Sequence, residues 1–247
     1  MDRILSTDEV LKLIQEAIAL KKPLSLSRFG HGEIAYATWP RNKKWRKGFE
    51  YYRNYAGAAS SIEELNKALI DSLFNSDIVG IHVIKDDSQY EVRADEPCAE
   101  ITKKLLKRLD FTPKYVCSAW VTHHMIDHTA FWELLRQNNI ALVGRRAKEA
   151  TPYFQRLGVN IVDSIPLEGL DQIDEVCEKL SNNDMWDITL LAAGIPATIL
   201  SPLLSKKSNR VVIDFGHALD RLIEGNSFSD ERLTKEWLNT SFRQSEE

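Results

Sequence analysis

Short apolar segments alternate with longer segments whose apolar residues recur at helical spacing, and this alternation runs through most of the chain. The short segments predict β-strands, and several of them are continuous apolar runs, as in strands that are covered on both faces. The predicted strands span 24–30, 78–84, 115–120, 140–144, 159–165, 188–194 and 210–216.

The segments between the strands predict helices. Ser6 with Glu9 and Ser61 with Glu64 form capping boxes, and each opens an amphipathic run. Further helices are expected over 99–109, 129–139, part of 148–158, 170–182 and 196–207. The resulting order predicts an α/β fold: a Rossmann-like, mostly parallel sheet with helices on both faces. We expect a single domain over residues 1–225 and a polar C-terminal tail over 226–247 with a short helix around 230–238.

Composition and charge restrict the class of protein. The chain has 247 residues, 43% of them hydrophobic, and a formal net charge of −4. This acidic balance argues against a nucleic-acid partner. Three widely spaced cysteines form no CxxC pair, the N-terminus is too acidic for a signal peptide, and no apolar run approaches the ~20 residues of a transmembrane segment. We therefore expect a cytoplasmic protein, and the sequence also allows a homo-oligomer.

The first candidate site follows the first strand, because ligands bind outside the carboxyl ends of parallel strands. Here the sequence reads RFGHGE, residues 28–33. Arg28 could pair with a phosphate or carboxylate, Gly30 and Gly32 would allow a tight turn, and Glu33 and His31 could bind Mg²⁺ or Mn²⁺. The alternative is an ordinary turn in which Arg28 and Glu33 pair with each other. The spacing is not a GxGxxG fingerprint, so it gives little support to dinucleotide binding.

Two further strand ends carry candidate residues. Gly194 precedes a helix, and its free N–H groups with Thr198 could hold a phosphate; the alternative is a plain strand-to-helix turn. Asp214 and His217 flank Gly216 after the last strand and could reach a metal, a ribose or an acceptor hydroxyl. As isolated residues they would more often be a hydrogen-bonded strand-end carboxylate and a surface histidine.

Histidines and basic residues supply the remaining candidates. Among His123, His124 and His128, we consider one, His124, as a general base; a zinc site is not expected there, because no HExxH pattern completes it. Residues 41–47 hold basic side chains around a tryptophan, and 39–60 form a loop that could close over a ligand as a lid.

In combination, the ordered motifs SRFGHGE, VGRR, AGIPATILSPLLSKK and VVIDFGH resemble bacterial glycosyltransferases of the GT-D type over about residues 24–220. That family typically has Arg-Phe-Gly-Asp-Gly-Glu in the first motif, and its later motif ends in Gly-His. Arg28, Phe29, Gly30, Gly32 and Glu33 match the first motif. His31 stands where the family has aspartate.

The resemblance implies transfer of a sugar from a nucleotide-diphosphate sugar, usually a UDP-sugar, to a glycan or glycoprotein acceptor. It also implies a divalent cation, Mn²⁺ or Mg²⁺, near the acidic motif, with Glu33 at the family's glutamate position. An imidazole at position 31 suits Mn²⁺. Two other functions remain open: a nucleotide-sugar-binding partner without catalysis, suggested by His31, and a Rossmann-like phosphate-binding hydrolase.

Overall fold

The computed structural model describes residues 4–41, 61–82 and 96–229, and the structural statements below concern these residues. They contain a seven-stranded sheet in the order β3-β2-β1-β7-β6-β4-β5, and every neighbouring pair is parallel. All seven predicted strands are confirmed. They are β1 (Leu24–Phe29), β2 (Ile78–Ile81), β3 (Tyr115–Ser118), β4 (Asn139–Gly144), β5 (Asn160–Ile165), β6 (Ile188–Ala192) and β7 (Val211–Asp214).

Helices connect the strands, as the amphipathic segments predict. Both predicted capping boxes are present, at Ser6 and at Ser61. The described residues contain ten α-helices: α1 (Thr7–Ala19), α2 (His31–Ala37), α4 (Ile62–Asn75), α5 (Glu96–Arg108), α6 (Val121–Met125), α7 (Thr129–Arg136), α8 (Ala147–Arg156), α9 (Ile173–Ser181), α10 (Ile195–Ser208) and α11 (Ala218–Glu224). Short 3₁₀ turns, η2 and η3, occur at Leu170–Gln172 and Gly225–Ser227.

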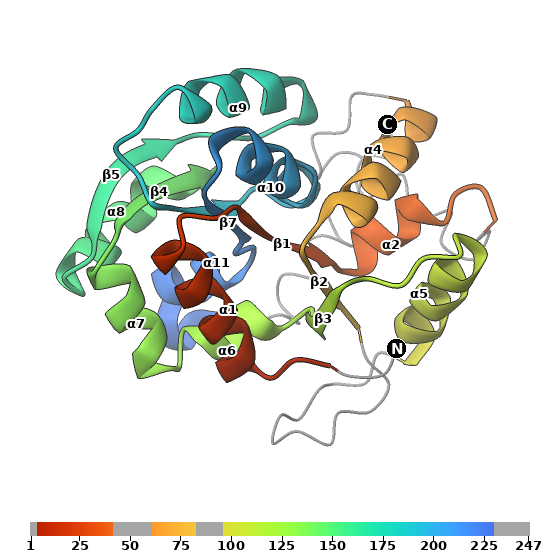
Figure 1. Ribbon diagram of the computed structural model, residues 1–247, viewed down its shortest axis with the longest axis horizontal. Coiled ribbons are helices and arrows are strands. Elements are labelled where there is room, and N and C mark those ends of the chain that lie inside the picture. The colour runs from red at the N-terminus through yellow and green to blue at the C-terminus, as the bar shows by residue number, and fades with distance from the viewer. Residues whose placement is uncertain (1–3, 42–60, 83–95, 230–247) are drawn as a thin grey trace.

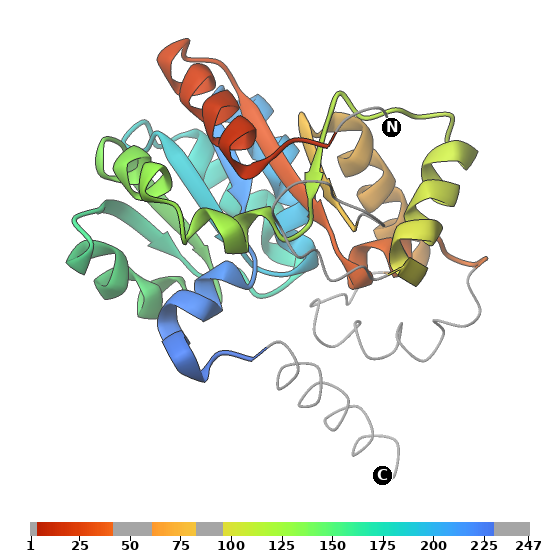
Figure 2. The same ribbon diagram turned by 90° about the horizontal axis from the view of Figure 1, so that it is seen from below.

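Two hydrophobic cores lie on opposite faces of the sheet (Figures 1 and 2). Buried residues of α2, α4, α5, α9 and α10 form the first core, and those of α1, α6, α7, α8 and α11 form the second. The expected α/β arrangement with helices on both faces is therefore confirmed. No helix among the described residues is long and apolar enough to cross a bilayer.

The sequence pattern did not identify three short helices, α2, α6 and α11. α2 starts two residues after β1 ends, and α6 starts three residues after β3 ends. Each is shorter than the window in which helical periodicity can be read. Most of the proposed lid, residues 42–60, the end of the second predicted strand and the tail from 230 lie outside the described residues, so those predictions stay predictions.

The pairing of β1 with β7 places the two motifs side by side. Leu26 is in register with Ile213, so the residues that follow on each strand reach the same edge of the sheet. β1 then continues into α2 in the first core, whereas β7 continues into α11 in the second. Neighbouring strands whose connections leave to opposite faces open a crevice at their carboxyl ends, where α/β proteins bind ligands.

Candidate functional site

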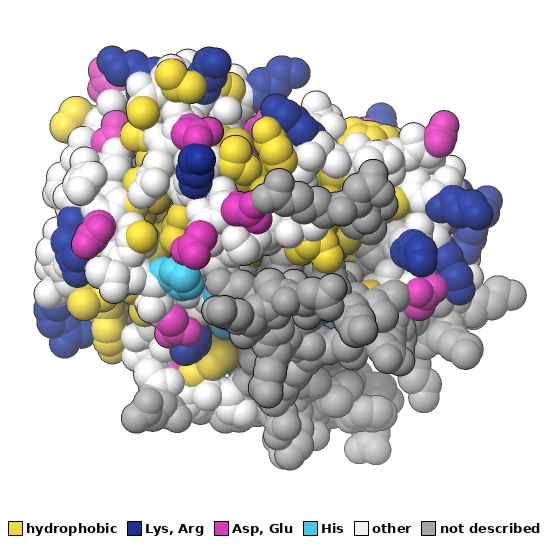
Figure 3. Space-filling model, turned by 60° about the horizontal axis from the view of Figure 1, so that its bottom comes forward, with side chains coloured by type: hydrophobic (Ala, Val, Ile, Leu, Met, Phe, Trp, Pro, Cys, Tyr) yellow, Lys and Arg dark blue, Asp and Glu magenta, His cyan; other side chains and the backbone are white. Residues whose placement is uncertain are grey.

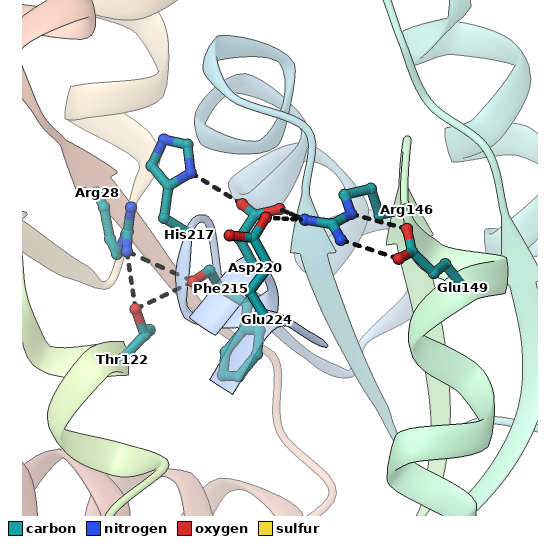
Figure 4. Close-up of polar contacts among 8 residues, drawn as sticks. All are labelled: Arg28, Thr122, Arg146, Glu149, Phe215, His217, Asp220 and Glu224. Carbon is teal, nitrogen blue, oxygen red and sulfur yellow. Dashed lines mark hydrogen bonds and ion pairs between the residues drawn. The ribbon is translucent and has the colours of Figure 1, made fainter. Parts of the chain in front are cut away.

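Arg28 is a largely buried cation at the junction of β1, β7 and α6 (Figure 4). Its backbone N–H donates to Asp214 Oδ2 at 3.0 Å. The guanidinium NH1 donates to Thr122 Oγ1 at 2.8 Å and to the Phe215 carbonyl at 3.4 Å. Only 15% of the side chain is exposed. The guanidinium is thus fixed in position before any ligand arrives.

Asp214 holds Arg28 from the sheet side. Its Oδ1 lies 3.8 Å from Arg28 Nε, and its Oδ2 accepts a hydrogen bond from the Thr198 hydroxyl at 3.0 Å. Burial raises the pKa of Asp214, and the Arg28 charge opposes that rise. Asp214 and Thr198 were candidates for the acceptor proton and for phosphate binding. In this arrangement their polar atoms are engaged by the protein, and they position Arg28.

Glu33 occupies the third position of α2 and folds back onto the start of the helix. The backbone N–H groups of Glu33 itself and of Gly30 favour the ionised form of the carboxylate. Burial, and secondly the charge of Asp214, raises the pKa of Glu33 to about 7. Arg28 pairs with Asp214 and only opposes this rise through its charge, so the alternative of a simple Arg28–Glu33 ion pair is not what the structure contains.

The motif glycines are needed for different reasons. Gly30 has a φ of −78°, so it does not adopt the left-handed region. A Cβ there would lie 3.1 Å from Glu33 Oε2, so its smallness makes room for the carboxylate. Gly216 has a φ of +52°, and a Cβ there would lie 2.3 Å from Arg28 NH2. Gly32 is buried within α2. The Phe29 side chain packs in the core, so only the Phe29 backbone could contact a ligand.

His217 begins a chain of polar contacts that leads away from Arg28. Its Nδ1 lies 2.9 Å from Asp220 Oδ2, and Asp220 Oδ1 accepts from Arg146 NH1 at 2.8 Å. Arg146 also pairs with Glu149 and Glu224. Figure 4 shows His217 between the Arg28 group and this acidic group. Figure 3 shows histidine beside acidic side chains on the same face of the molecule. A carboxylate that holds one imidazole nitrogen fixes the orientation of the other.

The three histidines near α6 lie in different environments. His123 is buried, and burial lowers its pKa to about 2, with the charge of Arg28 adding to the effect. It is therefore a neutral ring on the site side of α6. His128 lies beyond the helix and is 3.4 Å from Asp8. His124 is half-buried on α6, and its role as a base stays a prediction.

His31 lies in a second cluster, with His82 after β2 and Cys98 on α5. The ligand atoms of these three side chains all lie within 4.8 Å of one another. Glu33, two residues along α2, is not part of this cluster. Residues two apart on a helix do not face each other, which separates the two side chains that the sequence proposed as joint metal ligands.

Gly194 is placed as the sequence predicts, directly before α10. Its φ is +65°, and Pro196 lies in the first turn of the helix. β6, which Gly194 follows, neighbours β7, so this helix start belongs to the same edge of the sheet as Arg28 and Asp214. Phosphate binding there stays a prediction.

Sequence reasoning missed four residues that the fold brings to this edge: Thr122, Asp220, His82 and Cys98. Only Asp220 carries a local signal, because it follows His217 by three residues at the start of a helix and so can reach it. The others depend on which strands become neighbours.

Comparisons with known proteins agree with this architecture. Three solved structures of the domain of unknown function 1792 align with 92% of this chain, at 15–18% identity. One, described as a new glycosyltransferase from Streptococcus sanguinis, has a TM-score of 0.64 over 87% of its length. Another, described as having a distinct glycosyltransferase fold, has a TM-score of 0.59 over 83%. At these identities the likeness establishes the fold. No curated protein matches the chain.

The sequence itself matches one family, described as the GT-D fold-like domain, over residues 5–222. This range includes every strand of the sheet and both motifs around Arg28 and Asp214. The chain therefore belongs to the GT-D-like family.

Proposed function

We propose that this protein is a glycosyltransferase that moves a sugar from a nucleotide-diphosphate sugar, with UDP as the expected nucleotide, to a glycan or glycoprotein acceptor. Membership of the GT-D-like family supports the reaction class. The observation that carries the proposal is the convergence of Arg28, Glu33 and Asp214 where β1 and β7 end. A fixed cation beside two carboxylates can bind an anionic donor together with a metal ion.

Arg28 would bind the donor diphosphate. Transfer leaves a nucleoside diphosphate, whose charge must be balanced as the bond to the sugar breaks. The guanidinium is already oriented by Thr122 and Asp214, so little reorganisation is needed when a donor binds. Among the described residues, Arg28 NH1 donates to oxygens of Thr122 and Phe215. Arg28 NH2 instead lies against Gly216. The helix start after Gly194 could share the remaining phosphate charge.

A divalent cation would bind at Glu33; His31, the second ligand expected from the sequence, lies instead in the cluster with His82 and Cys98. Burial and the neighbouring Asp214 hold Glu33 partly protonated near neutral pH, and a cation would replace that proton. A carboxylate ligand suits both Mn²⁺ and Mg²⁺. When bound, such an ion supplies charge stabilisation to the leaving diphosphate.

His217 is our candidate for accepting the proton of the acceptor hydroxyl. Its Nδ1 is held by Asp220, which fixes the direction of Nε2. Asp214, the earlier alternative, has its oxygens engaged by Arg28 and Thr198. A base must lie within hydrogen-bond reach of the hydroxyl, and His217 is on the same side of β7 as the Arg28 guanidinium (Figure 4).

The proposal is tested by thermal unfolding of the full chain with UDP or UDP-glucose, each with and without Mn²⁺, followed by measurement of UDP release. We expect a nucleotide-dependent rise in the unfolding temperature that increases with Mn²⁺. Glu33→Gln should lose the Mn²⁺-dependent part, whereas Glu149→Gln, remote from α2, should keep it. No stabilisation by any nucleotide sugar with any divalent cation would contradict the proposal.

A second function, a nucleotide-sugar-binding partner without catalysis, is favoured by one observation. His31 replaces the family's aspartate, and it lies with His82 and Cys98 in a cluster that excludes Glu33. Donor binding without release of UDP, across a broad panel of acceptors, would favour this function over transfer.

A further inference from the structure

The His31, His82 and Cys98 cluster brings three metal-ligating side chains together from three separate elements. His31 is the first residue of α2, His82 directly follows β2, and Cys98 lies in the first turn of α5. The imidazole centroids of His31 and His82 are 4.5 Å apart, with the rings tilted by 54°. The convergence results from the packing of α2 and α5 over the end of β2, and no local motif encodes it.

The separations are close to those of a coordinated ion. Around a tetrahedral Zn²⁺, nitrogen and sulfur ligands lie about 3.3–3.6 Å from one another, given Zn–N and Zn–S distances of about 2.0 and 2.3 Å. The three ligand atoms here all lie within 4.8 Å of one another. Side-chain rotation covers the remaining difference, so no rearrangement of the helices is needed.

The chemistry of this set selects a softer ion than the one expected beside Glu33. Two imidazoles and one thiolate are ligands of Zn²⁺ and related ions, whereas Mg²⁺ and Ca²⁺ require oxygen. Three protein ligands leave the fourth position of a tetrahedral ion open, as in catalytic zinc sites. Binding through sulfur would release the thiol proton of Cys98 to solvent.

Burial shapes the cluster into a site with one open side. Cys98 is fully buried and His82 is 4% exposed, whereas His31 is partly exposed. Trp120 packs edge-on against His82, at a centroid distance of 6.3 Å, and supports that ring from the side of β3. Two ligands are therefore held rigidly in the core, and His31 lies on the side from which an ion would enter.

We infer that this protein binds one thiophilic divalent ion, of which Zn²⁺ is the model, through His31, His82 and Cys98. The site goes beyond the proposed sugar transfer and does not depend on it. An ion here would link the starts of α2 and α5 to the end of β2. Because Glu33 is not part of this cluster, the ion would occupy a site separate from the cation proposed beside Glu33.

The test is a Co²⁺ titration of the full chain after metal removal with a chelator, in the absence of nucleotide. Co²⁺ is a spectroscopic substitute for Zn²⁺. We expect one equivalent to produce a thiolate-to-cobalt charge-transfer band and visible bands of tetrahedral intensity, both abolished by stoichiometric Zn²⁺. Cys98→Ser should lose the charge-transfer band and lower the affinity by at least about 100-fold, more than the loss of an outer-shell partner costs.

Matched variants distinguish a site from general damage. Cys177→Ser also removes a buried thiol, and His128→Gln removes an imidazole outside the cluster; both should bind as the parent does. Because Cys98→Ser alters the core, His31→Ala at the partly exposed ligand provides a second test, and it should lose Zn²⁺-dependent thermal stabilisation. Absence of the charge-transfer band in the parent, or equal affinity in the parent and His31→Ala, would overturn the inference. Neither result depends on sugar transfer, so this test and that of the proposed function fail separately.

Discussion

At the scale of single residues, Glu33 is the side chain whose local and electrostatic roles conflict. Its carboxylate folds back onto the start of α2, partly buried and beside Asp214. Either condition alone would be ordinary. Together they make ionisation of Glu33 costly in the folded protein, and such a cost is retained where a site needs a carboxylate ready to bind a cation.

The substitution Glu33→Gln should stabilise the protein at alkaline pH. The folded pKa of about 7 exceeds the ordinary value of 4.5, so between these values the native state binds more protons than the unfolded state. Stability therefore falls as pH rises through this window, by up to about 3 kcal/mol. The substituted amide does not titrate, and its oxygen can still face the same backbone N–H groups. Urea unfolding should give the variant an advantage above about pH 7 that disappears below about pH 4.5.

Glu149 provides a control whose contribution to stability should change with pH in the opposite direction. Its hydrogen bonds to Arg146 lower its pKa, so Glu149→Gln should remove a contribution that is present above the ordinary pKa of glutamate and lost in acid. If Glu33→Gln showed this second pattern, Glu33 would be a stabilised anion, and the argument for a cation site beside it would fail.

His217 and Asp220 allow a second test at this scale. If His217 accepts the acceptor proton, His217→Gln should lower kcat by about 100-fold, within the range of general-base catalysis. Asp220→Asn should lower kcat less, because it misorients the imidazole without removing it. Asp127→Asn disrupts an ion pair with Arg221, which follows Asp220 on α11. This variant should leave kcat unchanged. Thermal stabilisation by the donor should persist in all three, and its loss would assign His217 to donor binding.

At the scale of elements, the sequence determines more of the sheet than of the site. Each strand is a short apolar run, and burial on both faces makes that pattern readable without any knowledge of its neighbours. The site residues are different. Thr122 contacts Arg28 from 94 positions away, and His82 meets Cys98 only because α5 packs beside α2. Such contacts depend on strand order, which a local pattern does not contain.

The glycine in the turn after β7, Gly216, can be tested against Gly225, the glycine that follows α11. Gly216 and Gly225 both have positive φ, +52° and +55°, so alanine at either position should cost about 1–3 kcal/mol of backbone strain. A Cβ at Gly225 would meet nothing within 4 Å, whereas one at Gly216 would meet Arg28 NH2. Gly216→Ala should therefore lose more stability in urea than Gly225→Ala, because it also displaces Arg28, and only Gly216→Ala should lose donor binding. Equal donor binding would show that the position of Arg28 is not critical.

At the scale of the whole molecule, the site brings together one residue near the beginning of the described chain and one near its end. Arg28 and Asp214 are 186 residues apart, and they connect β1 to β7 at the centre of the sheet. α10 reinforces this seam, because the Ser201 hydroxyl contacts the carbonyls of Leu26 and Val212, one on each strand. A ligand that binds between the two motifs therefore binds across a contact on which the fold itself depends.

This arrangement predicts that a donor protects both motifs together. In hydrogen exchange with UDP and Mn²⁺, amides of residues 28–33 and 214–217 should slow in parallel, because one anion would engage groups on both strands. Arg28→Lys, which keeps the charge but loses the planar fork that contacts Thr122 and Phe215, should reduce protection at both motifs. Lys114→Arg, the reverse exchange before the start of β3, should leave protection intact. Protection confined to one motif would place the donor on one strand alone and remove the reason for treating the β1–β7 seam as the binding site.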